Sequence, residues 1–463
     1  MLSNFPTARL RELDAAHHFH PFTDHGALKL DERRVIVRAD GVWLHDSEGN
    51  RILDGMAGLW CMNVGHGRQE IVEAVRAQMS ELSYYNTFFK TTNEPVIELS
   101  ALLSEITPPQ FNMFFYGSSG SDSNDTILRM VRTYWDLMGK PDKKTVIARK
   151  NAYHGSTIAG ASLGGMGGMH AQSGLPIPGI VHIAQPYWFG EGMDMSKDEF
   201  GIHAARELER EIDRLGEGNI AAFIAEPIQG AGGVIIPPDS YWPEIRRILK
   251  ERDILFVSDE VICGFGRTGN WFGCETYGTE PDLMTMAKGL SSGYLPIGAV
   301  AVSREIARVF HEKGGEFYHG YTYSGHPAAC AAAIANLKIM RREKIVERVA
   351  SDIGPYLQER WLRLGDHELV GEARMTGLVG ALELVPDKKN LARRFENIGT
   401  VGAMARDNSF ANGLVMRAVR DSLILSPPLV LSHEEADILV EKASKTLDDT
   451  WAMLKKQGLV SPE

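Results

Sequence analysis

The sequence predicts an α/β protein, with a large domain built on a mostly parallel central sheet and a smaller α+β domain beside it. Three observations lead to this fold class. Short β-rich runs alternate with amphipathic helical patterns between residues 111 and 260, as in βαβ units. Strands such as ILFV at 254–257 are apolar at every position, which is typical of a sheet covered on both faces. The alternation ends at about residue 329.

The alternating region begins with a strand at 111–116. A helix is predicted at 126–139, because apolar residues recur there at helical spacing on one face: Ile127, Met130, Val131, Tyr134 and Met138. Further strands are predicted at 144–149, 180–184, 220–227 and 254–260. Further helices are predicted at 203–216 and 241–253. Strands and helices that alternate in this way form a parallel sheet.

The last third of the chain has a different pattern. A long alanine-rich helix at 327–350 is followed by short strands at 377–385 and 422–427. A final helix opens with Ser432 and Glu435 at the spacing of a capping box. The first 70 residues have strand and turn signals at 34–55. We expect residues 1–70 to join a small domain formed by 329–463, and residues 71–328 to form the large domain.

Composition narrows the class of protein. The 463 residues carry a net charge of −11, which disfavours a general nucleic-acid binder. The four cysteines form no Cys-x-x-Cys pair, so we expect reduced thiols. The N-terminal sequence has no apolar core of a secretory signal, and no run approaches the ~18 apolar residues of a membrane span. We therefore expect a cytoplasmic protein that does not enter a membrane.

One motif suggests a nicotinamide cofactor. GFGRTG at 264–269 matches G-x-G-x-x-G after a strand, and Asp282 follows at a distance that suits a ribose contact. The fingerprint should open a helix, but the residues after it have no helical periodicity and contain several breakers. An NAD-dependent dehydrogenase stays an alternative of a different class.

Lys288 is the one charged residue after Asp282 in the apolar stretch 281–300. Burial disfavours the charged form of lysine and so lowers its pKa. The neutral amine is the form that condenses with a carbonyl group. The alternative is a lysine at a strand end that extends its amine to solvent.

Three other features favour the catalytic interpretation. Asp259 ends a predicted parallel strand and so points to the crevice where ligands bind, or it caps the next turn. The backbone amides at Gly120 and Ser121 open a helix after a Gly/Ser loop, which suits a phosphate or ordinary helix capping. Tyr153 follows the next strand as a stacking ring or a core residue.

One cofactor needs all four groups, namely pyridoxal 5′-phosphate. The lysine binds its aldehyde, and the aspartate keeps its ring nitrogen protonated, so that the ring withdraws electrons. The start of the helix binds the phosphate, and the tyrosine stacks on the ring.

Here the sequence resembles the class III aminotransferases, a family of pyridoxal-phosphate enzymes of fold type I. The resemblance spans nearly the whole chain and is carried by SDEVICGFGRTGNWFG at 258–273, by AKG at 287–289, and by AEPIQG and YHGST. It implies that Lys288, Asp259, Tyr153, Gly120 and Ser121 bind the cofactor. It also implies roles for Val261 on the opposite ring face, Glu226 near Asp259, Gln229 near the ring hydroxyl, and Thr322 at the phosphate of a neighbouring subunit.

Within that family the chain resembles the pyruvate-dependent ω-aminotransferases. The resemblance implies that Trp60, Phe22 and Phe88 wall the substrate pocket and that Arg417 pairs with the keto-acid carboxylate. It implies ping-pong transfer from a primary amine or ω-amino acid to pyruvate, in a homodimer or tetramer with sites at the subunit interface. Another class III reaction with 2-oxoglutarate (4-aminobutyrate, ornithine or diamine) stays an alternative, as does a binding protein without catalysis.

Overall fold

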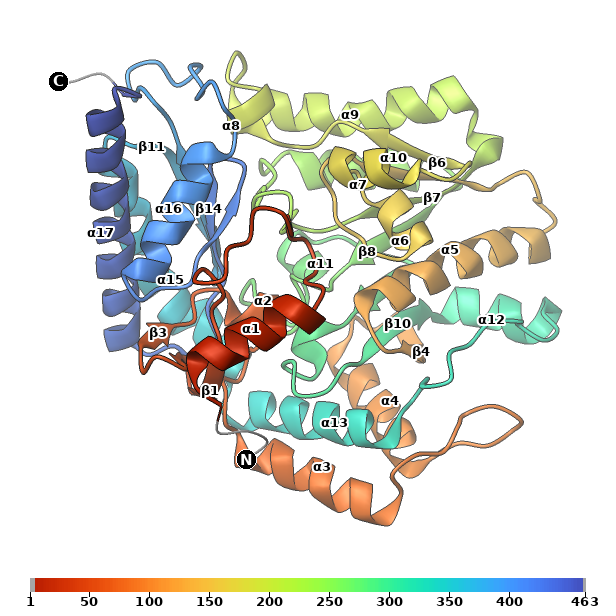
Figure 1. The fold of residues 1–463 in the computed structure, drawn as a ribbon. Helices are drawn as coiled ribbons and strands as arrows, with labels where there is room; N and C mark the ends of the chain where they lie inside the picture. Colours follow the sequence, from red (N-terminus) through yellow and green to blue (C-terminus); the bar gives the residue numbers. More distant parts are fainter. Residues whose placement is uncertain (1–4, 461–463) are drawn as a thin grey trace.

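A computed structural model describes residues 5–460 as three β-sheets surrounded by helices (Figure 1). The largest sheet has seven strands in the order β4-β10-β9-β8-β7-β5-β6. Its strands are β4 (Phe111–Gly117), β5 (Thr145–Arg149), β6 (Ile180–Ile183), β7 (Ile220–Ala225), β8 (Leu255–Asp259), β9 (Leu283–Met286) and β10 (Gly298–Ser303). The run from β9 to β6 is parallel, whereas β10 is antiparallel to both of its neighbours. The predicted fold class is confirmed.

Helices cover both faces of this sheet, which explains why β7, β8, β9 and β10 are buried at every position. One face packs on α5 (Gly120–Leu137) and α12 (Arg304–Lys313). The other packs on α9 (Lys197–Leu215) and α10 (Tyr241–Lys250). Shorter helices lie in the connections: α6 (Ile158–Leu163), α7 (Gly167–Ser173), α8 (Trp188–Glu191) and α11 (Gly273–Thr276).

A four-stranded antiparallel sheet lies toward the C-terminus, in the order β11-β12-β14-β13. Its strands are β11 (Val370–Thr376), β12 (Val379–Leu384), β13 (Arg417–Val419) and β14 (Ser422–Leu425). The helices around it are α15 (Gly354–Arg363), α16 (Thr400–Ala411) and α17 (His433–Gln457). The capping box of α17 is confirmed, since Ser432 accepts from the Glu435 amide and Glu435 accepts from the Ser432 amide.

The N-terminal segment contributes a third sheet, made of β1 (Ile36–Asp40), β2 (Trp43–Asp46) and β3 (Arg51–Leu53). Two helices, α1 (Thr7–His17) and α2 (Ala57–Trp60), belong to this segment, and α3 (Gln69–Glu81) and α4 (Glu94–Ile106) follow it. Leu53 forms a parallel bridge to Leu414, and Trp43 Nε1 donates to Glu435 at 3.0 Å. The segment therefore contacts the C-terminal region, while the division into residues 1–70, 71–328 and 329–463 stays a prediction.

The alanine-rich helix is shorter than the sequence predicts. It forms α13 (Pro327–Arg342), and the chain then turns at Lys344, which has a left-handed φ of +50°. It resumes as α14 (Ile345–Arg348) and a wider turn at Val349–Ile353. A left-handed residue cannot continue a right-handed helix, so the predicted element is divided. Within residues 5–460, no helix is long and apolar enough to cross a membrane.

Candidate active site

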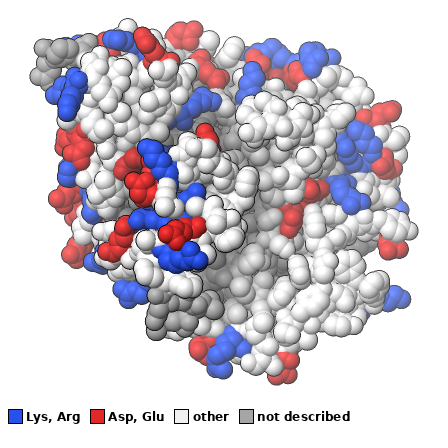
Figure 2. Space-filling view, viewed as in Figure 1, with Lys and Arg blue, Asp and Glu red and all other residues white. Residues whose placement is uncertain are grey.

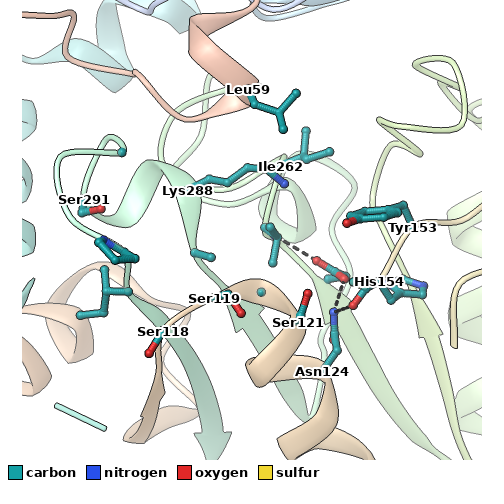
Figure 3. A pocket seen from close by; sticks show the side chains of 18 of the residues that line it. Leu59, Ser118, Ser119, Ser121, Asn124, Tyr153, His154, Ile262, Lys288 and Ser291 are labelled. Carbon is teal, nitrogen blue, oxygen red and sulfur yellow. Dashed lines mark hydrogen bonds and ion pairs between the residues drawn. The ribbon is translucent and has the colours of Figure 1, made fainter. Parts of the chain in front are cut away.

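A cavity of about 430 Å³ lies where β7, β8 and β9 end and α5 begins. The face of the molecule is hollowed between the N-terminal segment and α5 (Figure 2). Figure 3 shows the side chains that line the cavity. Lys288, Asp259 and Tyr153 all belong to this lining, as do Gly120, Ser121, Val261 and Glu226. Ligands bind at the carboxyl ends of the strands of parallel sheets, because the loops that follow the strands meet there.

Lys288 follows β9 and has a left-handed φ of +43°. Its amine points into the cavity (Figure 3), and its Nζ has no hydrogen bond or ion pair within the part of the chain that is described. Burial lowers the pKa of Lys288, although Asp259 and Glu226 act in the opposite direction. A lysine with a lowered pKa and no partner can present a neutral amine.

Asp259 ends β8 and is 3% exposed. Its Oδ2 accepts from His154 Nδ1 at 2.7 Å and from Asn124 Nδ2 at 2.8 Å, and its Oδ1 accepts from the Val261 amide at 3.1 Å. Burial alone would raise the pKa of Asp259, but the hydrogen bonds from His154 and Asn124 hold it below the ordinary value. The carboxylate is therefore kept ionised in a buried position.

His154 and Asn124 are functional residues that the sequence analysis did not single out. Each adjoins a predicted motif, since His154 follows Tyr153 and Asn124 lies near the start of α5. Asn124 Nδ2 also donates to the His154 carbonyl at 2.8 Å, which ties the two segments together beneath the cavity. A carboxylate only accepts, so the His154 proton lies on Nδ1.

Glu226 follows β7 and is 2% exposed. Its Oε1 accepts from the Tyr153 amide at 3.1 Å and its Oε2 from the Gly230 amide at 2.9 Å. Burial raises its pKa. Glu226 therefore fixes the segment that carries Tyr153, rather than contacting Asp259 through a hydrogen bond.

The start of α5 has the form of an anion cradle. Ser119 is the N-cap, and its side chain accepts from the Asp122 amide at 3.1 Å. The amides of Gly120 and Ser121 precede the first intrahelical hydrogen bonds and remain available. A side chain at Gly120 would place Cβ 2.9 Å from Val261 Cγ2, so only glycine fits against Val261.

Tyr153 lies across the cavity from Lys288 (Figure 3), and its hydroxyl is 2.9 Å from Ser156 Oγ. The Phe22 ring meets the Tyr153 ring edge-on, with 6.4 Å between centroids. Burial lowers the pKa of Arg417, and Tyr153 acts in the opposite direction. The Arg417 guanidinium has no hydrogen bond or ion pair to any residue between 5 and 460 that the structure describes. An unpaired guanidinium near the cavity suits a carboxylate ligand.

Six predicted site residues lie outside the cavity lining, and two of them are Phe22 and Arg417, which lie near Tyr153. Trp60 is 2% exposed and packs in a core cluster with Ile262, while its neighbour Leu59 lines the cavity. Gln229 is buried, and its Nε2 donates to the Lys150 carbonyl at 3.0 Å. The remaining two are Phe88 and Thr322, in neighbouring segments that Tyr84 joins by donating to the Thr322 carbonyl at 2.6 Å. The predicted roles of these six residues stay predictions.

The dinucleotide alternative lacks its structural context. Residues 264–269 form a series of turns, and the only helix that follows closely within the described chain is the single turn of α11. Asp282 precedes β9 and accepts from the Phe256 amide at 2.8 Å, at the edge of the sheet opposite the cavity. The predicted absence of the fingerprint's helix is confirmed.

Comparison with known proteins gives a consistent result. The family model Aminotransferase class-III matches residues 27–447. A putrescine–pyruvate aminotransferase from Pseudomonas aeruginosa is 57% identical, covering 97% of this chain and 98% of that protein. Gamma aminobutyrate transaminase 3 from Solanum lycopersicum is 42% identical, with 90% and 81% covered. The structure of an (S)-enantioselective ω-transaminase from Thermomicrobium roseum superposes with a TM-score of 0.93 at 42% identity, covering 97% of this chain and all of that one.

Proposed function

This chain belongs to the class III aminotransferases, and we propose that it moves amino groups from primary amines or ω-amino acids to pyruvate, releasing alanine. Two findings support the proposal. Lys288 and Asp259 converge on one cavity, which provides the chemistry of transamination. The relative named as a putrescine–pyruvate aminotransferase is 57% identical over nearly the whole chain. This similarity is the basis for proposing an amine donor and pyruvate as the substrates.

The cavity residues fit pyridoxal 5′-phosphate. Two free amides at the start of α5 suit its phosphate, the unpartnered Lys288 amine suits its aldehyde, and the ionised Asp259 suits its ring nitrogen. Tyr153 and Val261 lie on the cavity wall, where they would face the ring. When bound, this cofactor supplies an aldehyde that captures the amine and a pyridine ring that withdraws electrons from the reacting carbon.

The residues of this chain then control protons and orientation. Lys288 Nζ, whose pKa burial lowers, would take a proton from the carbon that bears the donor nitrogen and would return it on the other side of that nitrogen. Asp259, held ionised by His154 and Asn124, would keep a proton on the ring nitrogen. The amino group stays in the site between the two half-reactions, so the kinetics are ping-pong.

Arg417 supplies the recognition of the keto acid in this proposal. Its guanidinium is unpaired within the described chain and lies close enough to Tyr153 for that residue to act on the pKa of Arg417. A bidentate pair with a carboxylate is the strongest interaction available to it. The apolar side chains Leu59 and Phe22 suit the carbon chain of an amine, the predicted wall Phe88 would complete the pocket, and Trp60 would support it from the core beside Ile262.

A panel of donors and acceptors tests the proposal. Putrescine, β-alanine, 4-aminobutyrate and 1-phenylethylamine are each offered with pyruvate or with 2-oxoglutarate, and alanine and glutamate are measured. We expect alanine from pyruvate to form at least about tenfold faster than glutamate. Faster glutamate formation would favour the alternative in which the chain acts on 4-aminobutyrate, ornithine or a diamine with 2-oxoglutarate.

We propose a homodimer, or a tetramer built from it, in which Thr322 approaches the partner's phosphate site. Exposed aromatic side chains support an interface at two adjoining segments, since Phe89 is 89% and Tyr318 is 77% exposed. The surface over the segments that precede α4 and α13 is largely uncharged in Figure 2. Light scattering of the purified protein should give at least twice the mass of one chain.

The four free cysteines support a reducing, cytoplasmic environment.

A further inference from the structure

The turn at residues 56–61, between β3 and α3, has an unusual backbone. Ala57 has a φ of +48° and Trp60 a φ of +66°, both in the left-handed region, and Gly58 between them has a φ of +65°. Residues with side chains seldom adopt this region, and such strain persists only where surrounding contacts hold it. Strained segments of this kind concentrate at functional sites.

Buried Asp54 holds this turn. Its Oδ1 accepts from the Met56 amide at 3.1 Å and its Oδ2 from the Gly58 amide at 2.7 Å. The same Oδ2 lies 3.1 Å from His66 Nε2. Asp54 is 0% exposed, so it cannot exchange these partners for water without opening the turn.

His66 is itself anchored by its backbone. Its amide donates to the Gly41 carbonyl at 2.8 Å, and its carbonyl accepts from the Gly41 amide at 3.1 Å. The amide of Asp54 donates to the Val42 carbonyl at 2.9 Å. Both members of the Asp54–His66 pair are therefore fixed to the same N-terminal sheet, and the turn is held from a rigid base.

The strained backbone decides which side chain enters the cavity. Leu59 is 58% exposed and lies above Lys288 on the cavity wall (Figure 3). Trp60 is directed into the core against Ile262. A relaxed turn would change the direction of both side chains, because each left-handed residue redirects the chain that follows it.

We propose that the Asp54–His66 pair positions Leu59 and thereby limits the size of the amine donor. This inference rests on the proposed function, since it concerns the donor pocket of that same site. Neither residue lines the cavity, so both are positioning residues that act through the turn at 56–61. Loss of the pair lets Leu59 move out of the cavity, so that kcat/KM rises for bulky donors relative to small donors.

The first test compares Asp54→Asn with Asp46→Asn. Asp46 is a matched control, because it also accepts from two backbone amides, Glu48 and Asn50, each at 2.9 Å, in a turn away from the cavity. For the holoenzyme we expect the kcat/KM ratio of 1-phenylethylamine to 2-aminopropane to rise about tenfold in Asp54→Asn. The ratio should be unchanged in Asp46→Asn.

A second readout follows the turn without catalysis. Cys61 closes the turn, with its thiol 3.5 Å from the Ala57 carbonyl, and it is the one partly exposed cysteine of the four. A thiol reagent should label Cys61 at least about threefold faster in Asp54→Asn, with Cys61→Ser identifying the signal. If Asp54→Asn does not fold, His66→Phe removes one of the three hydrogen bonds and should shift both readouts in the same direction by less.

The results separate this inference from the proposed function. If the unaltered enzyme does not transaminate pyruvate with any donor, the proposed function fails. If it does, and the donor ratio stays within twofold in Asp54→Asn, or in His66→Phe where Asp54→Asn does not fold, while Cys61 labelling accelerates, the turn has moved without affecting the choice of donor by size. That outcome overturns the inference, and so does unchanged Cys61 labelling.

Discussion

Replacing His154 with leucine should convert a buried, ionised Asp259 into a carboxyl group that is protonated more easily. The substitution removes the 2.7 Å hydrogen bond to Oδ2 and leaves those from Asn124 and the Val261 amide. A hydrogen bond to a charged group contributes about 1.5–3 kcal/mol. If this free energy no longer stabilises the state with a protonated ring nitrogen, the activation barrier rises by the same amount and kcat falls about ten- to a hundredfold.

The pH dependence gives the sign of the effect. The pKa of Asp259 is lowered in the folded protein, so the ionised form persists to acid pH and its contribution to activity and stability is lost only as the pH falls through that lowered value. Without the His154 hydrogen bond the pKa of Asp259 rises. The acid limb of the kcat profile should therefore move to higher pH in His154→Leu.

The assay measures kcat for amine and pyruvate from pH 5 to pH 9 in three variants. His154→Gln retains an N–H donor and should recover part of the lost activity. His182→Leu is a control, because His182 is a half-buried histidine whose ring contacts the Leu163 carbonyl away from the cavity. An acid limb that stays in place in His154→Leu, with kcat reduced or not, would refute the reasoning about Asp259.

Three further predictions concern the cavity and the arginine near it. Lys288→Ala should lower kcat by more than about a thousandfold in a donor assay, because the proton carrier is lost, and near-normal turnover would contradict its role. Arg417→Ala should raise KM for pyruvate at least about tenfold more than KM for a simple amine. Arg420→Ala is its control, since Arg420 on the same hairpin already donates to Asn151 at 2.7 Å, and equal changes in both KM values would argue against carboxylate binding. Gly120→Ala should weaken pyridoxal 5′-phosphate binding at least about tenfold by fluorescence titration, because its Cβ meets Val261 at 2.9 Å, whereas Gly167→Ala has open space and should leave affinity unchanged.

The central sheet was predictable because its signals are local. Continuous apolar runs such as 220–225 and 255–257 identify buried strands, and alternation with helices requires parallel order. The convergence of Lys288 and Asp259 follows from the same rule, since both lie just beyond, or at, the carboxyl ends of parallel strands. Local pattern and topology together were enough to place these two side chains in one crevice.

The features that the sequence did not predict have a different physical origin. The contacts of His154 and Asn124 with Asp259 join segments that are far apart in sequence, and neither residue type predicts such a contact by itself. Trp60 and Leu59 differ in direction because of left-handed backbone angles, which composition does not reveal. Lys344 is compatible with a helix by propensity, so tertiary packing decides the break there.

The bridge between Leu53 and Leu414 has a consequence for biosynthesis. The N-terminal sheet is synthesised early. Its strand β3 can pair with Leu414 only after most of the polypeptide has been synthesised. Until then the strand exposes unpaired backbone groups to other nascent chains. Premature termination before residue 414 would leave that edge open permanently, so incomplete products are expected to be insoluble rather than merely inactive.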